Sequence, residues 1–131
     1  MAEFEVHSSS ANVDRACLRL RKERGVCERN KELLLRFTQD RLARGISRLR
    51  TVKCLYVLRY LARWHKASFE EATKESLTSL VNEVECRPLS AASKHDFKAI
   101  LKVFFKWLKG NDEEYPPEIR WLKPKMKQKY K

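Results

Sequence analysis

Glycine and proline are scarce in this chain of 131 residues, which holds three glycines and four prolines. An all-β chain needs a turn about every 8–12 residues, and turns are made mainly from these two residue types. Long apolar runs are also lacking, because the longest spans residues 54–58 and the first ten residues have none. We therefore expect an all-α protein with no membrane span and no signal peptide.

Motifs of metal sites and active sites are missing as well. The chain has no C-x-x-C pair, no Gly-rich phosphate loop and no H-E-x-x-H motif. Its histidines, at positions 7, 65 and 95, have no second ligand or carboxylate at catalytic spacing. The sequence therefore predicts no metal, no cofactor, no small-molecule substrate and no catalysis in this chain. It predicts reduced thiols at positions 17, 27, 54 and 86.

Positive charge, in contrast, is abundant. Lys and Arg number 29 against 17 Asp and Glu, which gives a net charge of +12. Residues 67–86 are the exception, because they sum to −4 and the rest of the chain carries +16. A surface this basic is typical of proteins that bind nucleic acid or another polyanion.

Apolar periodicity and capping residues predict three helices in the first half of the chain. After a loose tail over residues 1–12, a short helix is expected over residues 13–23. Asn30 is expected to cap a second helix that ends before Gly45, and Ser47 a third that continues to about residue 66. The third helix has apolar residues almost all round, which predicts a central, buried position.

The second half is expected to hold two further helices and a strap. Thr73 is expected to cap a helix that ends near residue 86, and Ser90 or Ser93 a last long helix that Gly110 ends. Two prolines at positions 116 and 117 favour an extended strap beyond it. The residues expected to pack against the core in this half are Leu77, Leu80, Val81, Val84, Ile119, Trp121 and Leu122.

The last long helix carries a row of lysines on one border of its apolar face. The first four of these lysines recur every four residues and extend over about 18 Å at 1.5 Å per residue, and a fifth follows three residues later. Their mutual repulsion destabilises an isolated helix, whereas a polyanion alongside would make the same charges attractive. A merely solvated face is the alternative, but no Glu alternates with the lysines. The row consists of Lys94, Lys98, Lys102, Lys106 and Lys109.

A second basic row is expected as a narrow exposed stripe on the third helix. Its guanidinium groups suit both phosphate oxygens and guanine edges. Near the start of this helix, positive side chains and free backbone N–H groups predict a phosphate dock. Salt bridges to the acidic helix over residues 73–86 are the alternative interpretation. The predicted DNA contacts on this helix are Arg48, Arg50, Arg59, Arg63 and Lys66.

Five motifs follow one another along residues 30–123. They are N-K-E-L-L-L-R-F at 30–37, I-S-x-x-R-x-x-x-x-L-x-x-L-R-x-L-A-x-W at 46–64, F-E-E-A-T-K-E at 69–75, S-K-H-D-F-K-x-x-L-K-x-F-F-K-W-L-K-G at 93–110 and E-Y-P-P-E-I-R-W-L-K at 114–123. In this order they resemble the N-terminal core-binding domain, a SAM-like domain, of tyrosine recombinases of the phage-integrase type. The resemblance is strongest to archaeal integrases.

This resemblance implies a compact four- to five-helix orthogonal bundle that grips double-stranded DNA at a recombination site, with further recombinase protomers on the same DNA. The family's His-x-x-Arg box is absent, and Tyr130 lacks the context of the family's nucleophile. We therefore expect binding in DNA integration and recombination without cleavage, in the cytoplasm at the nucleoid. The alternative is a protein-interaction bundle whose basic face docks an acidic partner.

The expected organisation has three parts. Residues 1–29 form an N-terminal tail with a short helix, and residues 30–110 form the helical DNA-binding core. Residues 111–131 form the strap and a basic linker or tail, whose alternating lysines at 123, 125, 127, 129 and 131 predict a nonspecific electrostatic arm.

Overall fold

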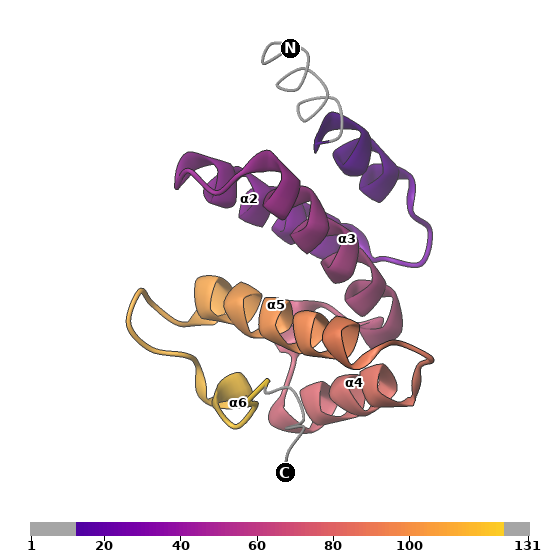
Figure 1. Ribbon diagram of the computed structural model, residues 1–131, viewed down its shortest axis with the longest axis vertical. Helices are drawn as coiled ribbons and strands as arrows, with labels where there is room; N and C mark the ends of the chain where they lie inside the picture. The colour runs from indigo at the N-terminus through magenta and orange to yellow at the C-terminus, as the bar shows by residue number, and fades with distance from the viewer. Residues whose placement is uncertain (1–12, 125–131) are drawn as a thin grey trace. The chain divides into compact units, whose positions relative to one another are not determined.

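The computed structural model describes residues 13–124 and confirms the all-α class (Figure 1). Residues 13–124 contain no strand. The helices fall into two units, and we call the described residues 13–66 unit 1 and the described residues 67–124 unit 2. Within the described part, no helix is long and apolar enough to cross a bilayer. The tail predicted over residues 1–12, His7, Tyr130 and the lysines from position 125 onward lie outside the described residues.

Unit 1 consists of a helix over residues 13–22, α2 (Glu28–Ala43) and α3 (Arg48–His65). Helices α2 and α3 pack side by side (Figure 1). The helix over residues 13–22 buries Val13 and Leu20, and Val26 after it is also buried. It therefore contributes to the core of unit 1, whereas the sequence had placed it in a tail. The other large apolar side chains of this core are Leu33, Leu34, Phe37, Leu55, Leu58 and Leu61.

The start of α2 differs from the predicted one. The helix begins at Glu28 after Cys27, and Asn30 is fully buried inside its first turn. The prediction that Asn30 caps this helix was therefore wrong, and the N-cap residue Cys27 makes no side-chain capping bond. The carboxylate of Glu28 lies in the first turn, where a negative charge is favourable. The end of α2 is as predicted, because Gly45 follows it with a φ of +85° that glycine adopts without strain.

Ser47 caps α3 as predicted, since its hydroxyl accepts a hydrogen bond of 3.2 Å from the backbone N–H of Arg50. The helix is not buried all round, however. Leu49 is 68% exposed and Tyr56 is 49% exposed, so α3 has one face in solvent.

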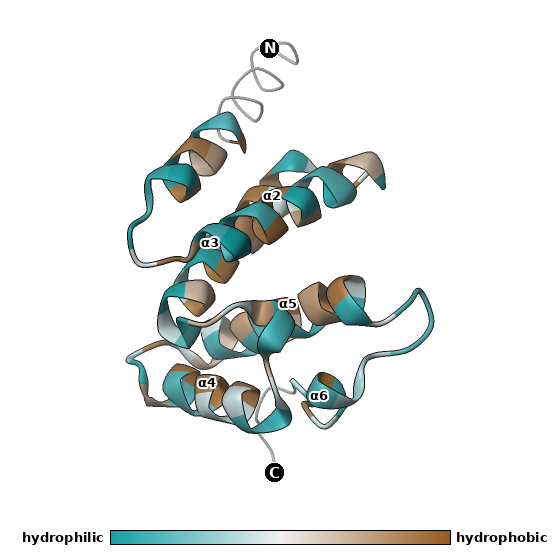
Figure 2. Cartoon of the chain, turned by 180° about the vertical axis from the view of Figure 1, so that it is seen from behind, coloured by the Kyte–Doolittle hydropathy of each residue, from teal (hydrophilic) through white to brown (hydrophobic). Residues whose placement is uncertain are grey.

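Unit 2 consists of a 3-10 turn (Phe69–Glu71), α4 (Lys74–Cys86), α5 (Ala91–Lys109) and the short α6 (Pro117–Arg120). Helices α4, α5 and α6 contact one another. Thr73 caps α4 in a reciprocal capping box with Ser76, and Ser90, not Ser93, caps α5. Figure 2 shows apolar and polar stretches alternating along α5, as expected for an amphipathic helix. The largest fully buried side chains of unit 2 are Phe69, Leu77, Val84, Leu101, Phe104, Phe105 and Ile119.

The strap predicted at the two prolines is instead the start of α6. Pro117 is the first residue of that helix, a position where a missing N–H group costs nothing. The turn buries Ile119 and Leu122 as predicted. Trp121 stays half-buried and donates its indole N–H to the Glu118 carbonyl at 2.6 Å.

Gly110 ends α5 at a close approach of two chain segments. A Cβ atom at this position would lie 2.4 Å from the Glu114 carbonyl oxygen and 2.9 Å from the Lys106 carbonyl oxygen. We expect Gly110→Ala to lower the free energy of unfolding by about 1–3 kcal/mol, because backbone atoms must shift. Urea denaturation followed by circular dichroism measures this effect. Gly25→Ala is the control, since its Cβ would meet nothing closer than 3.4 Å; equal stability of both variants would contradict the prediction.

Candidate nucleic-acid interface

The positive charge is distributed unequally between the two units. Unit 1 holds 16 Lys and Arg against 5 Asp and Glu, a net charge of +11. Unit 2 holds 9 Lys and Arg against 10 Asp and Glu, a net charge of −1. The basic excess of the described chain therefore belongs to unit 1, although the predicted lysine row lies in unit 2.

Acidic side chains from other elements pair with the lysine row. Lys94 donates to the backbone carbonyl of Glu85 at 2.9 Å, and Lys98 forms a short ion pair with the carboxylate of the same residue in α4. Lys109 pairs with Glu118 of α6 at 3.4 Å. The glutamates that are absent from α5 itself thus come from its neighbours in unit 2.

The two remaining lysines of the row hold the segment between α5 and α6. Their ammonium groups lie over the ring of Tyr115, Lys102 at 4.5 Å and Lys106 at 4.9 Å from its centroid. Desolvation by burial, with a smaller effect of Lys123, lowers the pKa of Lys102. The row is therefore engaged within unit 2 instead of standing open to solvent.

The predicted arginine stripe on α3 is only partly exposed. Arg59 is 9% exposed, and its guanidinium donates to the Glu23 carboxylate at 2.9 Å. Arg63 binds the other oxygen of the same carboxylate at 3.3 Å. The prediction that Arg59 lies on an exposed stripe was therefore wrong, because Arg59 is buried and pairs with Glu23, the residue directly after the helix over residues 13–22. The stripe's remaining members, Arg48 and Lys66, are exposed and form no ion pair within the described residues.

The turn before α3 was predicted to dock a phosphate. Arg41 and Arg44 beside it both bind the carboxylate of Asp40, at 2.7 and 3.0 Å. Partial burial of Asp40 opposes its ionisation, but the hydrogen bonds from the two arginines lower its pKa overall. Arg50 is exposed and forms no ion pair in the described part of the chain, so it remains available to an anion at this turn, as does Arg48.

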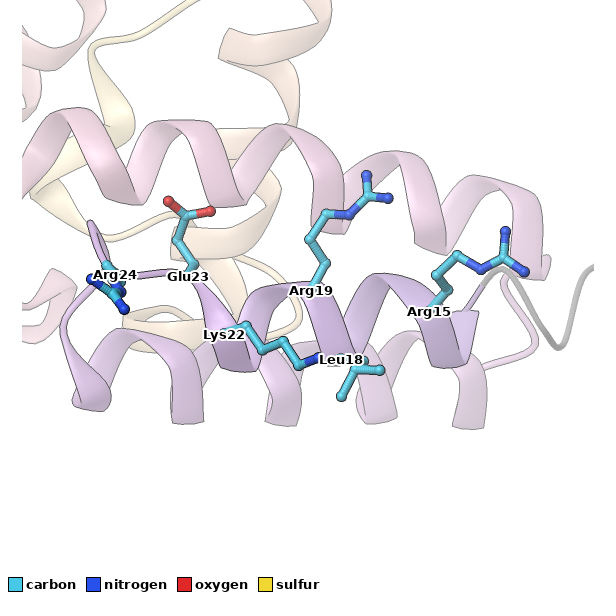
Figure 3. Close-up of a pocket in the computed structure, with 6 residues that line it drawn as sticks. All are labelled: Arg15, Leu18, Arg19, Lys22, Glu23 and Arg24. Atoms are coloured by element: carbon cyan, nitrogen blue, oxygen red, sulfur yellow. The ribbon is translucent and has the colours of Figure 1, made fainter.

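The helix over residues 13–22 carries a cationic stripe that the sequence analysis missed. Arg15, Leu18, Arg19 and Lys22 recur at i, i+3, i+4 and i+7 and are exposed. Together with Glu23 and Arg24 they line a hollow of about 550 Å³ (Figure 3). The spacing of these residues is visible in the sequence, where the apolar residues of the same helix predict only that it is amphipathic. Its three cations form no ion pair within the residues that the structure describes.

A groove separates this helix from α3. Arg15 and Arg19 line it from one side, and Val52, Tyr56 and Arg59 from the other; its volume is about 260 Å³. In Figure 3, Arg15 and Arg19 point to the same side of their helix as Glu23. The groove thus has arginines along one border and an exposed aromatic ring on the other.

Three aromatic rings follow one another along α3, and the first of them, that of Tyr56, belongs to an exposed residue. The Tyr56 and Tyr60 rings meet edge to face at 5.1 Å, and Trp64 follows Tyr60 at 5.9 Å. Arg59 lies over both tyrosine rings, at 5.8 and 5.1 Å, and Arg63 lies over Tyr60 at 5.6 Å. A side-chain hydrogen bond with Tyr60 raises the pKa of Tyr56 above its usual value.

The four cysteines are free thiols. Cys17, Cys27 and Cys54 are half-buried and Cys86 is exposed. Burial raises the pKa of the Cys17 and Cys54 thiols, which makes them less reactive. Over residues 13–124, no group of three or more His, Cys, Asp or Glu side chains is arranged to hold a metal ion.

Comparison with known proteins identifies no relative of this chain, since no family model, no curated protein and no solved structure matches it.

Proposed function

We propose that this chain binds double-stranded DNA through the cationic surface of unit 1. The observation that carries the proposal is a net charge of +11 over residues 13–66, together with the exposure of many of the cationic side chains in this unit. DNA phosphates near such side chains release condensed counterions, which is the main source of affinity for a duplex. The exposed cations of unit 1 that form no ion pair within the described residues are Arg15, Arg19, Arg21, Lys22, Arg24, Arg48, Arg50 and Lys66.

The resemblance to core-binding domains of tyrosine recombinases supports the same function and suggests its setting, site-specific integration and recombination on the nucleoid. Within this proposal the chain holds DNA and carries out no cleavage. Mixed with supercoiled plasmid, it is expected to retard the DNA in a gel without nicking it. The lysine row of α5 contributes less than its sequence suggested, because Glu85, Glu118 and Tyr115 engage it.

Salt dependence tests the proposal. We expect the association constant for a labelled duplex of about 30 base pairs to fall by about 500-fold between about 50 and 200 mM salt if five phosphates are contacted. Fluorescence anisotropy at several salt concentrations gives the slope of log K against log salt. A slope near zero would refute the proposal. Displacement of the duplex by poly-glutamate as effectively as by unlabelled DNA would favour the acidic protein partner instead.

A further inference from the structure

We propose that the groove between residues 13–22 and α3 binds an unpaired nucleotide, whose base stacks on Tyr56 while its phosphates contact Arg15 and Arg19. The ligand class is single-stranded nucleic acid. The site shares Arg15 and Arg19 with the surface proposed to bind duplex DNA. The inference does not depend on duplex binding, because only a base outside the double helix can stack on Tyr56.

Tyr56 has the properties of a stacking platform. Tyr56 is 49% exposed and lines the groove. The edge-to-face contact with Tyr60 and the guanidinium of Arg59 hold it in place. Glu23 in turn fixes Arg59 through a 2.9 Å ion pair. The platform is therefore preorganised, and a base that binds there need not order the side chain first.

The opposite border of the groove supplies the charge that a nucleotide strand requires. Arg15 and Arg19 are one helical turn apart, about 6 Å along the axis, and both line the groove that Tyr56 lines. Both are exposed, and neither forms an ion pair within the described residues. Proteins bind single-stranded nucleic acid by combining two features. Cationic side chains lie along the phosphate backbone of the strand, and an aromatic ring beside them stacks on a base.

Oligonucleotides with and without bases separate stacking from charge. We expect the chain to bind a 5′-labelled oligothymidylate of about 12 nucleotides at least about fivefold more tightly than an abasic strand of equal length, since one stacked base contributes about 1–3 kcal/mol. Tyr56→Ala should abolish this difference, and Tyr56→Phe should retain it. Leu49→Ala, which truncates another exposed apolar side chain of α3, is the matched control and should leave it unchanged.

Several results would overturn the inference. Equal affinities of the unmodified chain for the two strands would show that only charge is recognised. A loss in Tyr56→Ala that is as large for the abasic strand as for oligothymidylate would assign Tyr56 a structural role. Duplex binding should change less than about twofold in Tyr56→Ala. If the unmodified chain failed to bind duplex DNA but still bound oligothymidylate more tightly than the abasic strand, the proposed function would be refuted and this inference supported.

Discussion

Reversing two charges on the first helix of unit 1, Arg15→Glu with Arg19→Glu, is expected to weaken duplex DNA binding by about tenfold or more at low salt. Each guanidinium that contacts a phosphate contributes a charge-assisted hydrogen bond worth about 1 kcal/mol or more. The slope of log K against log salt should flatten by about 2, one for each lost contact. Anisotropy titrations of the duplex at several salt concentrations measure both quantities.

A second double variant with the same change in net charge shows whether the position of the reversed charges in the protein matters. Lys74→Glu with Lys123→Glu also lowers the net charge by four, but it changes exposed side chains of unit 2. Lys74 is in the first turn of α4, where a Glu is favourable. We expect this variant to bind the duplex almost as tightly as the parent. Equal losses in both variants would mean that net charge alone determines affinity and that unit 1 is not the interface.

The lysine row of α5 is a poor place for the same test. Lys98→Glu would set a new carboxylate against Glu85, which Lys98 now neutralises. A loss of binding could then reflect a disturbed contact between α4 and α5. Arg15 and Arg19 have no such partner among the described residues, and Glu is a good helix former at both positions. Melting curves of both double variants should therefore match that of the parent.

Truncation of Phe104 is expected to have the largest effect on stability. Phe69, Phe104 and Phe105 are fully buried and meet edge to face, with ring centroids 5.2–5.7 Å apart. Phe104→Ala removes one of these three rings and leaves a cavity, which should lower the free energy of unfolding by about 3–5 kcal/mol. This is a large part of the total stability of an ordinary domain, about 5–15 kcal/mol.

Urea denaturation measures the loss, and Trp107 provides a local signal because its ring lies 5.8 Å from that of Phe104. Val103→Ala is the matched control on the same helix, since Val103 is exposed and its truncation should cost less than about 0.5 kcal/mol. A Phe104→Ala variant that lost less than about 1 kcal/mol would show that the aromatic cluster does not hold unit 2 together.

The amino-acid sequence by itself determined where most helices begin and end. Ser47, Thr73 and Ser90 cap helices because the side-chain hydroxyl of each accepts a hydrogen bond from the backbone N–H three residues later. This contact involves only neighbouring residues and so does not depend on the rest of the fold. Gly45 follows the end of α2 in the left-handed conformation, which is an equally local reason for that helix to end. Where local signals competed, the prediction failed: Asn30 lies inside a helix that starts earlier, and Pro117 starts a helix instead of preventing one.

Only the tertiary structure decided which charges are neutralised. Arg59 pairs with Glu23, 36 residues away, and Lys98 pairs with Glu85, 13 residues away. Helical periodicity places a side chain on a face, but it does not say which residue of another element covers that face. For the same reason the pattern over residues 13–22 showed an amphipathic helix without showing that its arginines line a groove with Tyr56. Charge composition is a property of the sequence, whereas exposed charge depends on packing between segments far apart in the chain.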